Sequence, residues 1–239
     1  LLMAALARAV RTWQQDHGID DDRPIGLLVE GHGRYDEVLA AGPDPRRADL
    51  ARTVGWFTSI APLQITVDGD AVHTVKAAKE ERLGRPDQGL GYGVLRYTDG
   101  HPLGQRPLPS IAFNYLGGGR GQGGERGPDT DSPDHTAVAF LPASDAPFLP
   151  AIYRGDLTPM SVLTVNASVI AGPDGPRIAA DLRFPDRILP VGAVTDLGER
   201  WAGELDRLVQ TVDAGPVGLS PSDVPGSGVT QHDLDGLAE

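Results

Sequence analysis

The apolar positions along the first part of the chain predict a helix followed by a buried strand. An amphipathic helix is predicted over residues 1 to about 16, because apolar side chains recur there at helical spacing. These side chains are Leu1, Leu2, Ala5, Leu6, Ala9, Val10 and Trp13. After a polar loop at residues 20–24, a continuous apolar run at 25–29 predicts a buried strand. Since no capping residue precedes Leu1, we expect the N-terminal part of a larger unit to be missing.

The middle of the chain alternates between strand-like and helix-like patterns. Residues 60–67 are predicted to be extended, with Pro62 favouring an edge or a bend. Residues 70–83 predict a helix that ends at Gly84. Its inward positions are predicted to be Val72, Val75, Ala78 and Leu83. A glycine-rich stretch at 89–93 precedes a predicted strand at 94–97, and residues 110–116 predict another strand.

The residue pattern in the last third of the chain predicts a hairpin and a long helix. Residues 160–170 and 177–184 pair as a hairpin around the turn-forming residues 172–175. Residues 191–213 predict a long amphipathic helix. Residues 117–136, rich in Gly, Pro and Asp, are predicted to form a mobile loop. We therefore expect one domain over residues 1–215, followed by a linker at 216–239.

The irregular order of strands and helices sets the expected fold class. Hairpin-like stretches stand beside single crossover helices, which favours a mixed β-sheet covered by helices on one side. The fold class predicted from the pattern is therefore α/β, in the form of an α+β sandwich.

Composition and charge exclude several classes of protein. The 239 residues are 40% hydrophobic and include no cysteine, which excludes disulfides, thiolate catalysis and cysteine-ligated metals. The formal net charge of −12 argues against a nucleic-acid partner. No apolar run approaches 18 residues and no secretory signal is visible, so we expect a cytoplasmic protein without a membrane partner.

The strongest candidate for chemistry follows the strand at 25–29. Glu30 would be partly desolvated there and suited to general acid–base work, or it would simply meet solvent or an arginine. His32, between two glycines, either shuttles protons or shapes the turn through a backbone hydrogen bond, and we favour the turn. Arg34 either anchors a phosphate or pairs with Asp36 or Glu37.

Two other aromatic-containing segments carry candidate residues. Asn114 and Tyr115 alternate in a predicted strand, so one of them should face inward, and an inward Asn needs a structural partner or a role. Trp56 and Phe57 would by default be core aromatics.

Metal and nucleotide sites are not predicted. The histidines outside this segment are scattered without ligand spacing, so we expect no metal site. The glycine-rich residues 117–124 lack the Lys and hydroxyl that a phosphate-binding loop needs.

Four motif-like segments follow one another along the chain: residues 30–34 (Glu-Gly-His-Gly-Arg), 52–58 (Arg-Thr-Val-Gly-Trp-Phe-Thr), 89–93 (Gly-Leu-Gly-Tyr-Gly) and 113–117 (Phe-Asn-Tyr-Leu-Gly). Taken in this order, they resemble the C-terminal subdomain of a nonribosomal peptide synthetase epimerization domain, a member of the condensation-domain superfamily. The resemblance extends from residue 1 to about 225 and includes Ser220-Pro221-Ser222-Asp223. It implies a chloramphenicol-acetyltransferase-like subdomain, one of two that enclose a tunnel.

The resemblance also implies a reaction and a way of presenting its substrate. Such domains invert the α-carbon of an aminoacyl or peptidyl thioester, an isomerisation in the synthesis of secondary metabolites such as antibiotics. No cofactor is implied to bind directly, because the phosphopantetheine arm of a peptidyl carrier domain presents the substrate. The implied partners are that carrier domain, the missing N-terminal subdomain and neighbouring synthetase modules.

The resemblance assigns roles residue by residue. Glu30, Asn114 and Tyr115 match active-site positions, and His32, Arg34, Trp56 and Tyr92 lie in the supporting motifs. Departures are Tyr35, where the family often has a second Glu, and Gly118, where Gln or Arg is common.

The largest departure is the absence of a His-His pair, whose second His is implicated with the Glu in proton transfer. We therefore expect the chain alone to be an incomplete enzyme. The alternative is a non-catalytic, condensation-like module that docks a carrier domain or a partner enzyme.

Overall fold

The computed structural model describes residues 1–40, 50, 52–118, 158–172, 175–215, 217–224, 226 and 228–236. Its helices are α1 (Leu2–Asp16), α2 (Asp36–Ala40), α3 (Ala71–Leu83), α4 (Tyr92–Tyr97), α5 (Val191–Ala214) and α6 (Gln231–Asp235). Its strands are β1 (Ile25–Gly31), β2 (Ser59–Ile65), β3 (Ile111–Gly118), β4 (Leu163–Gly172) and β5 (Gly175–Arg183). Short 3-10 helices are η1 (Pro86–Gly89), η2 (Pro102–Gln105) and η3 (Pro221–Asp223).

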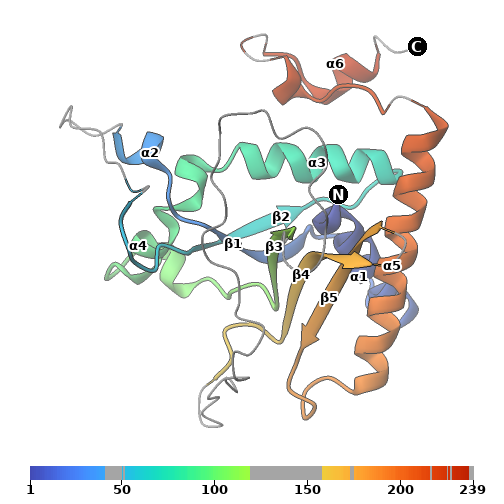
Figure 1. The fold of residues 1–239 in the computed structure, drawn as a ribbon, viewed down its shortest axis with the longest axis horizontal. Helices are drawn as coiled ribbons and strands as arrows, with labels where there is room; N and C mark the ends of the chain where they lie inside the picture. Colours follow the sequence, from blue (N-terminus) through green and yellow to red (C-terminus); the bar gives the residue numbers. More distant parts are fainter. Residues whose placement is uncertain are drawn as a thin grey trace.

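The five strands form one mixed sheet in the order β2-β1-β3-β4-β5 (Figure 1). The central strands β1, β3 and β4 are parallel, and the edge strands β2 and β5 pair antiparallel with their neighbours. The predicted hairpin is confirmed, because β4 and β5 pair from Thr164 with Arg183 to Gly172 with Gly175. The expected mixed sheet with helices is therefore confirmed.

The hydrophobic core lies between one face of the sheet and the helices α1, α3 and α5. Alternate strand residues face this core, as the period of two in a strand requires. From the strands, the core receives Ile25, Leu27, Ala61, Leu63, Ile65, Phe113, Leu163, Val165 and Ala167. The residues between them, including Glu30 and Asn114, lie on the opposite face of the sheet.

Polar contacts connect the three core helices. The Arg8 guanidinium of α1 donates to the Glu204 carboxylate of α5 at 2.8 Å, and it lies 3.4 Å from the Thr74 hydroxyl of α3. The Glu204 side chain is only 5% exposed, and a buried charge needs a partner. The guanidinium groups of Arg8 and Arg207 compensate it. Trp201 of α5 donates from Nε1 to the Leu2 carbonyl oxygen at 3.0 Å. These contacts fix the helical layer behind the sheet.

Two local predictions were wrong. Residues 94–97, predicted as a strand, belong to helix α4, and Thr98, the residue after it, donates from its hydroxyl to the Val94 carbonyl oxygen. A short apolar run does not distinguish a helix from a strand. Leu83, predicted to face inward, is 49% exposed, because α3 ends there and its last turn leaves the core.

Part of the predicted linker packs on helix α3. The Lys79 ammonium donates to the Asp223 carboxylate at 2.6 Å and to the Ser220 hydroxyl at 3.0 Å. The Glu80 carboxylate accepts from the Ser222 backbone N–H at 3.1 Å. Figure 1 shows α6 beyond α3, on the side away from the sheet. The domain boundary at residue 215 stays a prediction.

Removing the Lys79 charge is expected to loosen the C-terminal segment from α3. In Lys79→Met the Asp223 carboxylate loses its charged donor, so backbone amides of residues 220–224 should exchange with solvent faster. Hydrogen exchange with mass spectrometry measures this, and Arg82→Met on the same helix is the matched control. Unchanged exchange in Lys79→Met would contradict the contact.

The same contact carries a pH dependence. Hydrogen bonds from Lys79, and after it from the backbone and hydroxyl of Ser220, lower the pKa of Asp223 from 3.8 to about 2. The stabilisation is thus fully present above pH 3.8 and is lost as the pH falls through about 2.

Candidate functional site

Glu30 lies near the C-terminal end of β1, half-buried on the face of the sheet opposite the core. Its neighbour Val29 pairs with Phe113 of the parallel strand β3. The carboxyl ends of parallel strands are where open α/β sheets commonly bind ligands. The carboxylate therefore lies at an edge of the sheet suited to a substrate.

The structure brings Asn114 beside Glu30 and leaves Tyr115 on the other face. Val29 and Phe113 are the last paired residues of β1 and β3, so Glu30 and Asn114 are the next residues of the two strands and lie on the same face. Asn114 is half-buried. Tyr115 pairs with the buried Ala167 and points to the core side, where it is 49% exposed at the end of the packed region. Neither residue is fully buried, and Asn114 is the more buried of the two. The active-site role of Tyr115 stays a prediction.

A tight turn after Glu30 is organised by His32 and Arg34. The His32 ring nitrogen Nδ1 accepts from the Arg34 backbone N–H at 3.0 Å, which confirms the turn-shaping role. The Arg34 guanidinium donates to the carbonyl oxygens of Leu50 and Thr53, the second at 2.9 Å, and lies 4.2 Å from the Phe57 ring centroid. Of the two alternatives for Arg34, the pairing with Asp36 or Glu37 is not made, since its guanidinium donates to these carbonyl oxygens instead.

The turn depends on glycine at position 33. Gly33 has a φ of +66°, and a Cβ there would overlap the backbone carbonyl of Phe57. Gly33→Ala is expected to destabilise the chain by about 2 kcal/mol or more, because backbone strain adds to the clash. Thermal unfolding measures this, with Gly91→Ala as control, since a Cβ at Gly91 meets nothing within 4 Å. Equal melting temperatures would contradict the tight approach.

The other motif aromatics lie away from the core. Trp56 is 91% exposed, so the prediction of a core aromatic is wrong for this residue. Trp56 lies in the loop before β2, so it belongs to no strand that packs against the core. Tyr92 lies in the first turn of α4, where its hydroxyl accepts from the Arg96 guanidinium at 3.4 Å. The supporting roles of Trp56 and Tyr92 in their motifs stay predictions.

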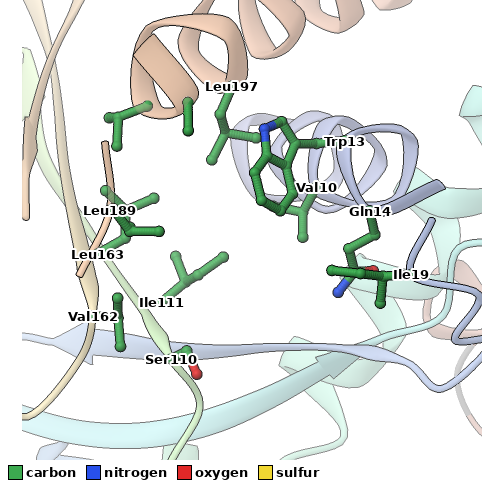
Figure 2. Close-up of a pocket in the computed structure, with 12 residues that line it drawn as sticks. Val10, Trp13, Gln14, Ile19, Ser110, Ile111, Val162, Leu163, Leu189 and Leu197 are labelled. Carbon is green, nitrogen blue, oxygen red and sulfur yellow. The ribbon is translucent and has the colours of Figure 1, made fainter. Parts of the chain in front are cut away.

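A separate apolar pocket lies at the opposite end of the central strands (Figure 2). It has a volume of about 190 Å³ and lies between α1, α5 and the starts of β3 and β4. Its lining includes Val10, Trp13, Ile111, Leu163 and Leu197 but no acidic or basic side chain. This pocket therefore offers no group for acid–base chemistry.

Within the part of the chain that the structure describes, no cluster of three or more His, Asp or Glu side chains could hold a metal ion. None of the helices described there is long and apolar enough to cross a membrane. The glycine-rich loop prediction for 117–136 falls, after Gly118, outside the described residues.

Sequence reasoning missed one polar residue on this face. Asn166 of β4 is the register partner of Asn114 and is half-buried like it. The sequence signal for Asn166 is the same as for Asn114: a polar residue inside a predicted strand, here between Val165 and Ala167. Only the strand pairing shows that the two amides are neighbours.

Known proteins are similar to this chain in fold and in sequence. The fold matches the epimerization domain from the third module of tyrocidine synthetase B, with a TM-score of 0.59 and 22% identity, over 90% of this chain and 42% of that chain. One of the linear gramicidin synthase subunits of Brevibacillus parabrevis is 30% identical over 98% of this chain. Another subunit of the same synthase is 40% identical over 49% of this chain. No family model matches.

The chain therefore has the fold seen in an epimerization domain, and its relatives are subunits of nonribosomal peptide synthetases. The match to less than half of a whole epimerization domain is consistent with a C-terminal subdomain. The chain spans only 4% of the length of the first of the two gramicidin synthase subunits and 1% of the second.

Proposed function

We propose that this chain is part of an epimerization domain that converts an L-aminoacyl or peptidyl thioester on a carrier domain to the D form. The observation that carries the proposal is that Glu30 and Asn114 each follow the last paired residue of two neighbouring parallel strands, at their carboxyl ends. A carboxylate beside an amide supplies both a proton acceptor and a hydrogen-bond donor. A module that only docks a carrier domain needs neither.

In the proposed reaction, the Glu30 carboxylate exchanges a proton with the α-carbon of the substrate. When the Cα–H bond breaks, its electron pair moves toward the thioester carbonyl, and negative charge develops on the carbonyl oxygen. Donors aimed at that oxygen lower the barrier. A proton returned from the opposite face completes the inversion, and the described site offers no histidine for that step beyond His32, which holds the turn.

Partners follow from the same proposal. The substrate arrives on the phosphopantetheine arm of a peptidyl carrier domain, and no cofactor of the domain's own takes part. A second subdomain supplies the opposite wall of the site, so we expect the 239-residue chain alone to catalyse no epimerization.

The test uses the full-length synthetase that contains this chain and an aminoacyl carrier protein. Incubation in deuterated water should incorporate deuterium at the α-carbon and yield a mixture of L and D residues. Quenched samples are hydrolysed and analysed by chiral chromatography with mass spectrometry. Carrier binding without deuterium incorporation would contradict the proposal and would favour the docking module.

A further inference from the structure

A row of polar side chains crosses four strands at the level of Glu30. Glu30 and Asn114 directly follow Val29 and Phe113, the last paired residues of β1 and β3, so they are next in register on one face. Asn114 pairs with Asn166 of β4, and Asn166 pairs with Asp181 of β5. Neighbouring strands are about 4.8 Å apart, so side chains at one level on one face are immediate neighbours.

This row lies on the face of the sheet that the core helices do not cover. Phe113 is 3% exposed and Val165 is fully buried, and both pack in the core with Trp201. The residues that follow them, Asn114 and Asn166, point to the opposite face because successive side chains alternate. The row is therefore part of the same surface as the proposed site.

Asn166 differs from the outer member of the row. Asp181 is exposed and paired with the Arg183 guanidinium of its own strand. Asn166 is half-buried, and within the described ranges its side-chain amide has no protein partner but is not sealed from water. The N–H groups of this amide can therefore donate to water or to a bound ligand beside Asn114.

We propose that Asn166 contacts the substrate and, with Asn114, forms a pair of amide donors for the thioester carbonyl oxygen. This inference rests on the proposed function. As the proton leaves the α-carbon for the Glu30 carboxylate, the carbonyl oxygen gains negative charge and the side-chain N–H of Asn166 donates to it. When the proton returns to the opposite face, the thioester re-forms and no co-reactant is consumed.

The test measures epimerization by the full-length synthetase carrying Asn166→Ala or Asn166→Asp. Loss of one oxyanion donor typically lowers kcat by about 100-fold or more. We expect that fall for both variants, with KM for the aminoacyl carrier and the melting temperature nearly unchanged. Asn166→Asp keeps the size of the side chain, so it stays informative if the alanine variant folds poorly.

The matched control is Gln64→Ala, an exposed amide on β2. Gln64 lies on the same face but pairs with Gly26, near the other end of β1. This variant should epimerize at the wild-type rate. Wild-type kcat in both Asn166 variants, or an effect on KM alone, would overturn the inference. If the wild-type synthetase itself exchanges no α-proton, the proposed function fails instead.

Discussion

Replacing Glu30 with glutamine in the full-length synthetase is expected to lower the exchange of the α-proton with solvent by about 1,000-fold. Glutamine has nearly the same shape but cannot accept the proton, and general acid–base catalysis typically contributes 100- to 10,000-fold. Deuterium incorporation into the carrier-bound residue measures the change. Carrier binding should persist, because the substitution leaves the fold and the adjacent turn intact.

The matched control for this prediction is Glu199→Gln. It makes the same change of charge on α5, behind the sheet, at an exposed position. Its exchange rate should equal that of the wild type. Rapid deuterium incorporation by Glu30→Gln would show that another group removes the proton, and loss of carrier binding would indicate damage to the fold.

Elements with strong periodicity could be predicted from the sequence. Helix α5 was predicted at 191–213 and runs from Val191 to Ala214, because its apolar stripe extends over many turns. Helix α3 begins where Asp70 caps it by accepting from the His73 backbone N–H. Both signals are local, so the sequence alone contains them.

The short segment at 94–97 could not be assigned in the same way. Its Val and Tyr residues favour strands locally, but Arg96 donates to the carbonyl oxygens of Leu103 and Arg106, and these bonds stabilise a helical turn. Such a contact depends on the path of the chain further along. Local propensity therefore gave the wrong element.

The candidate site could be predicted only in part. Glu30 stands out because it follows an apolar run, and its place at a strand end was foreseeable. The row from Glu30 through Asn114 to Asn166 depends on which strands are neighbours and on their register. A shift of one strand's register by one residue would move each of its side chains to the other face of the sheet. The exposure of Trp56 likewise depends on a chain path that hydrophobicity does not reveal.

Replacing Trp201 with alanine is expected to destabilise the 239-residue chain by about 3–5 kcal/mol, the usual cost of deleting a buried Trp. Trp201 is 3% exposed, packs edge-on against Phe113 with ring centroids 6.4 Å apart, and bonds to the Leu2 carbonyl oxygen. It thus joins α5, α1 and the strand that carries Asn114.

A loss of this size corresponds to a melting temperature roughly 10 °C lower for a chain of this length. Thermal and urea unfolding of the chain measure it. Trp201→Phe keeps most of the apolar surface and loses the hydrogen bond, so it should lose about 1–2 kcal/mol and stay measurable if the alanine variant does not fold. Val209→Ala, at an exposed position of α5, should change stability by less than about 0.5 kcal/mol. A loss below about 1 kcal/mol in Trp201→Ala would mean that the helical layer does not support β3 through this side chain.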